Sequence, residues 1–155
     1  MAADPHGWNS WQAYKSAHEG KLAQYADHFL VDDRLTYTIS PELIYWDGAL
    51  ICADGIEIHV HRFQAIGDKR GQRWVRTTAY SYHVMMRFPE GVLDLLRYDN
   101  IGDHMSLGHA DQHHVHRFDA LGKERMEHVG QAGWPTLGDV LDEAYEFWVR
   151  RTGGP

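Results

Sequence analysis

The chain contains a long succession of strand-like segments separated by tight turns, and this feature constrains its fold most strongly. The segment "LTYTI" (35–39) alternates apolar and polar residues, and "RWVRTTAYSYHVMMRF" (73–88) is rich in β-branched and aromatic residues. Both features are typical of β-strands. Further strands are predicted at 92–99, 113–120 and 124–129. Since the predicted strands follow one another through short connections, we expect an antiparallel meander.

Turn-forming residues divide these segments. Asp47-Gly48 and Asp54-Gly55 are dipeptides that favour two-residue hairpin turns, and both lie in the apolar stretch 43–66. Pro89–Gly91 and Leu121-Gly122 are the next candidates, with proline and glycine at positions that suit a turn. We therefore expect the chain to reverse direction at each of these four places.

Helical periodicity occurs near the two ends of the chain. Residues 10–30 are predicted to form an amphipathic helix capped by Ser10, and residues 134–151 a second helix capped by Thr136, with Asp139 three residues later. The predicted buried faces are Trp11, Tyr14, His18, Leu22, Tyr25 and Phe29 in the first helix, and Leu137, Val140, Leu141, Ala144 and Phe147, with Trp148 beside them, in the second.

These patterns predict one α+β domain over residues 1–155, in which an antiparallel β-sheet meander is flanked by an N-terminal and a C-terminal helix. Residues 1–48 form the N-terminal helix and lead-in, and residues 49–155 form the core. No apolar run approaches the roughly 20 residues of a membrane helix, and the first residues do not resemble a signal peptide. Cys52 is the only cysteine, so no internal disulfide is expected. We expect a cytoplasmic protein without membrane association.

Charge is distributed unevenly along the chain. Residues 1–58 carry three Lys/Arg against nine Asp/Glu, residues 59–128 carry ten against nine, and residues 129–155 carry two against four. The net charge of −7 argues against a protein that binds nucleic acid by its overall charge. We expect the acidic first 58 residues and the C-terminal helix to be available to a protein partner, and any RNA surface to lie in the central part.

Histidines are concentrated in the central part. Five lie between Arg97 and Ala120, and the pentapeptide "HVHRF" occurs twice, at 59–63 and 114–118. Residues two apart on a strand share a face. Each copy should therefore place its two histidines and its phenylalanine on one face, so the two strands are expected to present similar surfaces.

The first chemical interpretation of these histidines is a metal site. Two H-x-H pairs could supply four imidazole ligands, which would be His59, His61, His114 and His116. No H-E-x-x-H or C-x-x-C motif accompanies them. We therefore expect no bound metal cofactor and keep the four-histidine site as an alternative.

The second interpretation is acid–base chemistry on a phosphodiester. Imidazole can both accept and donate a proton near neutral pH. Metal-free RNA cleavage needs a base for the 2′-hydroxyl, an acid for the leaving 5′-oxygen and a cation for the phosphate. Arg62, Arg97 and Arg117 are the candidate phosphate-binding residues, because a guanidinium forms bidentate contacts with phosphate.

Three segments in this order resemble the TumE-like toxin family. They are "RYDNIGDH" (97–104), "HHVHRFDALGKE" (113–124) and "WPTLGDVLDEAYEFW" (134–148), and the resemblance covers about residues 50–150. Members are small bacterial and archaeal proteins regarded as the toxin half of type II toxin–antitoxin pairs. The positions marked by the resemblance are Tyr98, Asp99, Asn100, His104, His114 and His116. It also implies a helix-turn-helix antitoxin as partner.

The sequence therefore predicts a toxin that acts as a metal-independent endoribonuclease on RNA. The predicted catalytic residues are His104, His114, His116, Tyr98 and Asp99. Two alternatives stay open: a β-domain that binds a metal through histidines, as a hydrolase or a binding protein, and a non-catalytic interaction module.

Overall fold

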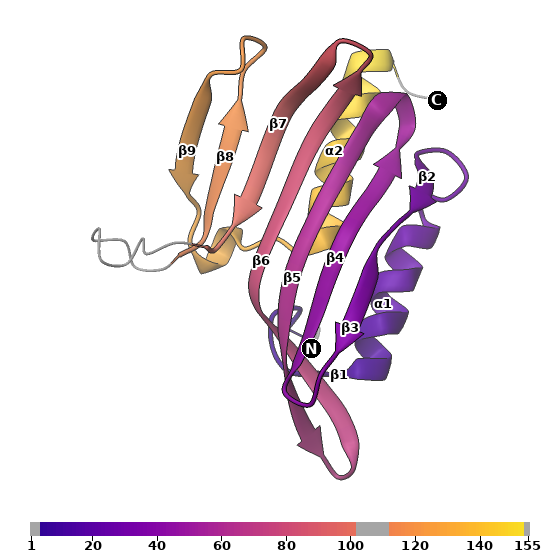
Figure 1. Cartoon of the computed structure of the whole chain (residues 1–155), viewed down its shortest axis with the longest axis vertical. Helices are drawn as coiled ribbons and strands as arrows, with labels where there is room; N and C mark the ends of the chain where they lie inside the picture. The colour runs from indigo at the N-terminus through magenta and orange to yellow at the C-terminus, as the bar shows by residue number, and fades with distance from the viewer. Residues whose placement is uncertain (1–3, 102–111, 154–155) are drawn as a thin grey trace.

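The computed structural model describes residues 4–101 and 112–153. Within these residues the chain forms one large antiparallel sheet with both of its α-helices on the same side (Figure 1). The predicted α+β architecture, a meander flanked by an N-terminal and a C-terminal helix, is confirmed.

The sheet has nine strands, and its central strands are adjacent in sequence. Along the sheet the order is β2-β4-β5-β6-β7-β8-β9, while β1 pairs with β6 and β3 with β4. The strands are β1 (Asn9–Ser10), β2 (Leu30–Asp33), β3 (Thr36–Ile39), β4 (Leu43–Cys52), β5 (Ile56–Lys69), β6 (Gln72–Phe88), β7 (Gly91–Asp99), β8 (His114–Phe118) and β9 (Glu124–His128). Two short 3₁₀ turns, η1 (Ala53–Gly55) and η3 (Gln131–Gly133), complete the described elements.

Both helices begin at the predicted caps. Helix α1 (Trp11–Ala23) starts after Ser10, whose side chain accepts a hydrogen bond from the Ala13 amide, and α2 (Leu137–Thr152) starts after Thr136. Thr136 and Asp139 form a reciprocal capping box, which satisfies two backbone donors at the start of α2.

The prediction of a first helix as far as residue 30 was wrong beyond residue 23. The backbone carbonyl of Tyr25 accepts hydrogen bonds from the amides of His28, Phe29 and Leu30, so the chain turns here and enters β2. Tyr25 and Phe29 are buried nevertheless, because the turn carries them into the same core as the helix. The spacing of the apolar residues predicted their burial correctly, but the backbone after residue 23 forms the hydrogen bonds of a turn and not those of a helix.

Alternation along the strands separates a covered face of the sheet from an open face. In β5 the side chains of Ile56, Ile58 and Val60 are fully buried, while His59 and His61 between and after them point away from the core. The buried residues pack against α1 and α2 in one core that includes Leu22, Leu141 and other apolar side chains. We call the side that carries the helices the covered face and the other side the open face.

The four predicted turns have different outcomes. The chain reverses at Asp54-Gly55, at Pro89–Gly91 and at Leu121-Gly122, as expected. Asp47-Gly48 is not a turn, because β4 runs straight through it. Gly48 has φ 128°, and a Cβ atom there would lie 2.2 Å from the Arg34 carbonyl oxygen. This glycine therefore permits a neighbouring backbone segment to approach β4 closely.

We expect Gly48→Ala to lower the free energy of unfolding by about 2–3 kcal/mol, because the new methyl group meets backbone atoms in a strained conformation. The matched control is Gly20→Ala in α1, where nothing lies within 4 Å of the added Cβ. The control should be stabilised by about 0.5–1 kcal/mol, since alanine favours a helix. Urea unfolding measures both variants, and equal stabilities of Gly48→Ala and the wild type would contradict the role given to Gly48.

Candidate functional site

A group of polar side chains meets on the open face where β7 and β8 pair. Asp99 is the last residue of β7, and the strand register places it opposite His114 and places Arg97 opposite His116. These four side chains line a shallow depression of about 370 Å³. Four of the predicted site residues therefore come together, although they are spread over 20 positions of the sequence.

The Asp99 carboxylate is the centre of this group. It is buried, with 4% of the residue exposed. Its Oδ1 lies 2.9 Å from Nε2 of His114 and accepts a hydrogen bond of 3.1 Å from the Ile101 amide. Its Oδ2 accepts a 3.0 Å hydrogen bond from Nε of Arg97. A buried carboxylate needs such donors, because removing its charge from water is costly.

His114 has a hydrogen-bond acceptor at each ring nitrogen. Nδ1 lies 2.8 Å from the backbone oxygen of Gln112, and Nε2 faces Asp99. A neutral imidazole donates only one hydrogen bond, whereas the imidazolium ion donates two. A neutral His114 can therefore donate to Gln112 through Nδ1 and bind a metal ion through Nε2.

His116 lies beside this pair with a different environment. Its Nδ1 contacts the Glu124 carboxylate, and its Nε2 lies 3.9 Å from Oδ2 of Asp99, too far for a hydrogen bond. The ring is 4.8 Å from that of His114, and its side chain is 12% exposed. His116 lines the depression, and in the tautomer whose Nδ1 donates to Glu124 its Nε2 carries the lone pair.

The same arrangement can hold a metal ion. Ligand atoms of Asp99, His114 and His116 all lie within 4.8 Å of one another. The outer nitrogen of each imidazole is oriented by an oxygen, from Gln112 for one ring and from Glu124 for the other. Metal-binding histidines usually have such a partner, which fixes the tautomer and the ring orientation. Two imidazoles and a carboxylate are suitable ligands for Zn²⁺ or another divalent transition metal.

The two H-x-H pairs do not form a joint site. His59 and His61 lie on β5, and β6 and β7 separate that strand from β8. Neighbouring strands are about 4.8 Å apart, so three strand spacings prevent one ion from reaching both pairs. The alternative four-histidine site is therefore wrong in this form. Three open-face histidines of β5 and β6 each have a carboxylate partner: His59 with Glu57, His61 with Asp47 and His83 with Asp94.

Tyr98 and Arg117 lie on the covered face, opposite the histidines. The Tyr98 hydroxyl donates a 2.9 Å hydrogen bond to Glu143 of α2, and Arg117 donates to both the Glu143 carboxylate, at 2.7 Å, and the Tyr98 oxygen, at 3.1 Å. Burial and the neighbouring Glu143 raise the pKa of Tyr98 to about 12. Their position makes them anchors between the sheet and α2, and separates them from Asp99 and His114.

Arg62 also lies on the covered face, far from the depression. Its side chain is 2% exposed and packs against the rings of Trp46 and Tyr14 on the side of α1. The alternation that unites the two histidines of each "HVHRF" copy thus sends the arginine to the opposite face. Of the three arginines predicted to bind phosphate, only Arg97 adjoins His114 and His116.

The remaining predicted positions have separate outcomes. His104 lies outside the described residues. Asn100 stabilises the end of β7, because its side chain accepts a 2.9 Å hydrogen bond from the Tyr80 amide and donates one of 2.9 Å to the Thr78 carbonyl. Glu124, Ser81 and Ile101 contribute to the site but were not predicted. The sequence alone does not give the strand register that brings them there.

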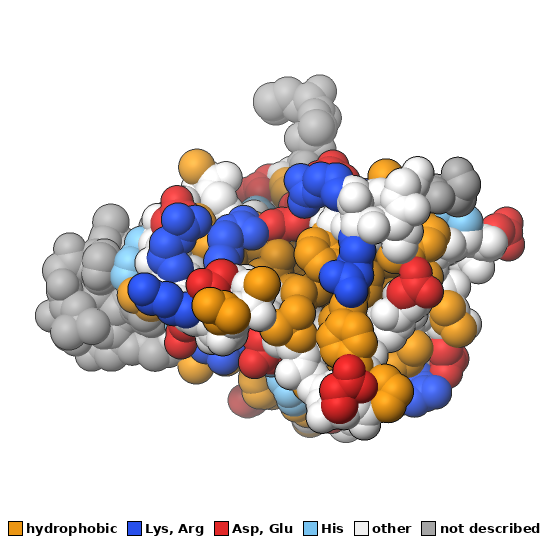
Figure 2. All heavy atoms as spheres, turned by 90° about the horizontal axis from the view of Figure 1, so that it is seen from above, with side chains coloured by type: hydrophobic (Ala, Val, Ile, Leu, Met, Phe, Trp, Pro, Cys, Tyr) orange, Lys and Arg blue, Asp and Glu red, His pale blue; other side chains and the backbone are white. Residues whose placement is uncertain are grey.

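Charges of both signs are interspersed on the surface. The end of the molecule where the β4–β5 and β6–β7 turns lie shows basic and acidic side chains side by side, with hydrophobic side chains between them (Figure 2). Among the described residues, no helix is both long enough and apolar enough to span a membrane.

Comparison with known proteins identifies no relative: no family model, no curated protein and no solved structure matches this chain. The resemblance to TumE-like toxins stays a prediction from sequence motifs.

A double-mutant cycle should distinguish the two faces of the sheet. We expect Tyr98→Phe and Glu143→Gln to be coupled by about 0.5–1.5 kcal/mol in the free energy of unfolding, because the first removes the donor of this hydrogen bond and the second replaces its charged acceptor by a neutral amide. His116→Ala combined with Glu143→Gln should be additive, since these residues lie on opposite faces. Urea denaturation gives all the values, and additivity of the first pair would contradict the proposed anchor.

His18 of α1 should make stability depend on pH. Burial and, second, the neighbouring Arg62 lower the pKa of His18 from 6.5 to about 4. Between these values the unfolded chain binds a proton that the folded chain does not, so stability is lost as the pH falls. We expect His18→Gln to lose about 2 kcal/mol less stability than the wild type between pH 7 and pH 4.5, measured by urea denaturation. Equal losses would contradict a buried neutral His18.

Proposed function

We propose that the chain is an RNA-cleaving toxin of the TumE-like kind, with its reaction centre at Asp99, His114 and His116. One observation carries the proposal. A buried carboxylate holds an imidazole and the Arg97 guanidinium, while a second imidazole beside them presents an unoccupied Nε2 to the open face. This combination provides a proton acceptor and a cation at one place, and both are needed for phosphodiester cleavage.

His116 is the proposed general base. Its Nε2 takes the proton from a ribose 2′-hydroxyl while the 2′-oxygen forms a bond to phosphorus. The bond from phosphorus to the 5′-oxygen breaks, leaving a 2′,3′-cyclic phosphate and, after protonation, a 5′-hydroxyl. Arg97 donates to Asp99 through Nε, which leaves its two terminal nitrogens for phosphate oxygens. His104 is the proposed acid for the leaving 5′-oxygen.

His114 is a positioning residue in this scheme. It is 2% exposed, and both of its ring nitrogens have partners. It holds Asp99 in place, and Asp99 in turn fixes the guanidinium of Arg97. The buried charges thus define the geometry, while the more exposed His116 exchanges the proton.

A metal-dependent hydrolase is the second candidate, favoured by the convergence of the three ligand atoms. A divalent ion there would activate a water molecule or polarise a phosphate oxygen. The same three residues would then bind the metal, and His116 would no longer be available as a base.

A helix-turn-helix antitoxin is the proposed partner, in a cytoplasmic toxin–antitoxin pair. The acidic N-terminal part and the C-terminal helix are the proposed docking surface. Of this surface, helices α1 and α2 lie on the covered side of the sheet, opposite Asp99 and His116 (Figure 1). RNA and antitoxin would thus approach from different sides.

We expect His116→Ala to reduce RNA cleavage in vitro by about 10²–10⁴-fold, as for loss of a general base, and to abolish growth inhibition on expression. The matched control is His61→Ala, because His61 occupies the equivalent position of the other "HVHRF" copy and lies on the same face. The control should retain activity, and both variants should keep the melting temperature within a few degrees. Full activity of His116→Ala would contradict the proposed centre.

Metal removal separates the two candidates. We expect cleavage by the untagged protein to persist in EDTA, with far less than one transition metal per chain by elemental analysis. About one metal ion per chain, lost together with activity on chelation and absent from His114→Ala, would instead select the hydrolase.

A further inference from the structure

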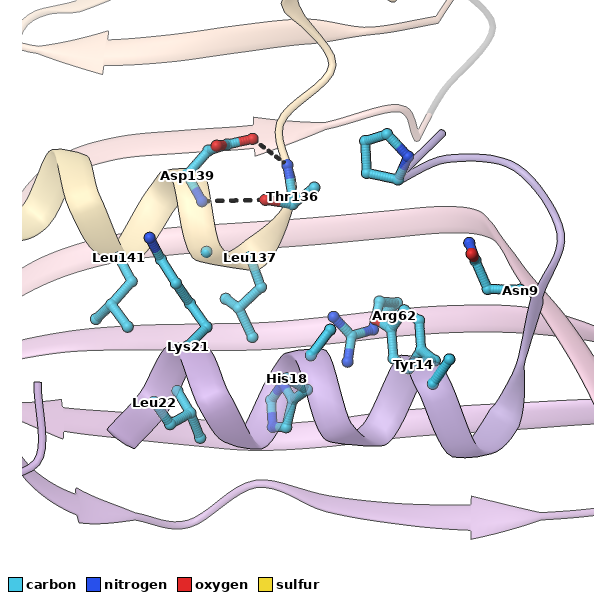
Figure 3. A pocket seen from close by; sticks show the side chains of 14 residues that line it. Asn9, Tyr14, His18, Lys21, Leu22, Arg62, Thr136, Leu137, Asp139 and Leu141 are labelled. Carbon is cyan, nitrogen blue, oxygen red and sulfur yellow. Dashed lines mark hydrogen bonds between the residues drawn. The ribbon is translucent and has the colours of Figure 1, made fainter. Parts of the chain in front are cut away.

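The covered face contains a cavity of about 470 Å³ that the proposed reaction does not use. It lies where α1, α2 and β5 meet, and residues from both helices point into it (Figure 3). Its walls are mainly apolar and include Ala13, Ala17, Leu22, Leu137 and Leu141. Polar side chains such as Asn9, Lys21 and Asp139 also line it. A cavity of this size that combines mainly apolar walls with converging polar groups is typical of a small-molecule site.

Arg62 supplies a charge inside this cavity. Its guanidinium reaches from β5 into the space between Tyr14, His18 and Leu137 (Figure 3). The residue is 2% exposed, and its Nε and Nη2 atoms are buried without a hydrogen-bond partner among the described residues. Buried polar groups are rarely left unsatisfied, and a buried charge is normally paired. The buried Arg62 guanidinium therefore lacks the anion that would normally pair with it.

The carboxylates around the cavity do not serve this purpose. Asp139 is occupied by the capping box with Thr136, and Asp142 by Lys21 and the Tyr25 hydroxyl. The contacts of Arg62 that the structure shows are with two aromatic rings, at 4.4 Å from Trp46 and 5.2 Å from Tyr14. Aromatic faces attract the cation but provide no hydrogen-bond acceptor for its N–H groups.

We propose that this cavity binds a small amphipathic carboxylate, whose anionic head pairs with Arg62 and whose apolar body lies between α1 and α2. A single buried guanidinium matches one carboxylate in charge and in its fork of donors. Lys21 at the rim is already paired with Asp142, so Arg62 is the lining cation for which the described residues show no carboxylate partner. A phosphate dianion would require a second positive charge beside Arg62. This proposal is independent of the reaction centre on the open face.

Decanoate is a suitable probe, with decan-1-ol as the uncharged analogue and decyl phosphate as the dianionic one. Calorimetric titration of the full chain should show one decanoate per molecule and a raised melting temperature. Decan-1-ol should bind at least tenfold more weakly. Absence of decanoate binding, or tighter binding of decyl phosphate, would overturn the proposed ligand class.

Two variants locate the binding. Arg62→Met should bind decanoate and decan-1-ol equally, because the guanidinium charge that favours the carboxylate over the alcohol is gone. Ala17→Phe should lose both ligands by filling the cavity from α1, whereas Ser16→Phe, on the same helix but outside the cavity lining, should bind as the wild type does. Undiminished decanoate binding by Ala17→Phe overturns the site even if Arg62→Met fails to fold. An unchanged preference for decanoate in a folded Arg62→Met overturns the role of Arg62.

Discussion

Burial of one face of the sheet against two helices is the constraint on which the other features depend. Neighbouring side chains along a strand point to opposite faces, so each position belongs either to the covered face or to the open face. In both "HVHRF" copies the valine and the arginine take the covered face, and the histidines take the open face. The same alternation produces the candidate reaction centre on the open face and the cavity on the covered face.

The two arginines of the repeat, Arg62 and Arg117, both lie on the covered face but differ in whether a carboxylate pairs with their charge. Arg117 is paired with Glu143 and hydrogen-bonded to Tyr98, so its charge is compensated where the sheet meets α2. Among residues 4–101 and 112–153, the contacts shown for Arg62 are with the aromatic rings of Tyr14 and Trp46, and such contacts are worth about 0.5–2 kcal/mol each. The effective penalty for burying an ion is several kcal/mol. Arg117 therefore helps to attach α2 to the sheet. The charge of Arg62 is buried without such a carboxylate, which is why we propose that an anion binds there.

Much of the fold could be predicted from the sequence, because strand alternation, turn dipeptides and helix caps are local signals. The caps Ser10 and Thr136 and three of the four turns were found in this way. Asp47-Gly48 misled because a glycine needed for close packing has the same appearance as a glycine needed for a turn. At the site, the structure brings together His114, His116, Asp99 and Arg97, four of the residues that the sequence marked. Arg62 and Arg117 were included as cations next to histidines in the sequence, and Tyr98 through the resemblance. Alternation along the strands places all three on the other face. Glu124 and Ser81 depend on strand register, which is a long-range property.

The cavity between the helices depends on parts of the chain that are far apart in the sequence. Its walls come from segments far apart in the sequence, Ala13–Leu22 on one side and Thr136–Leu141 on the other. The strands, by contrast, mostly pair with their neighbours in sequence. A chain that stops before Thr136 therefore keeps the residues of all the described strands but lacks the α2 wall of the cavity. The site needs both helices.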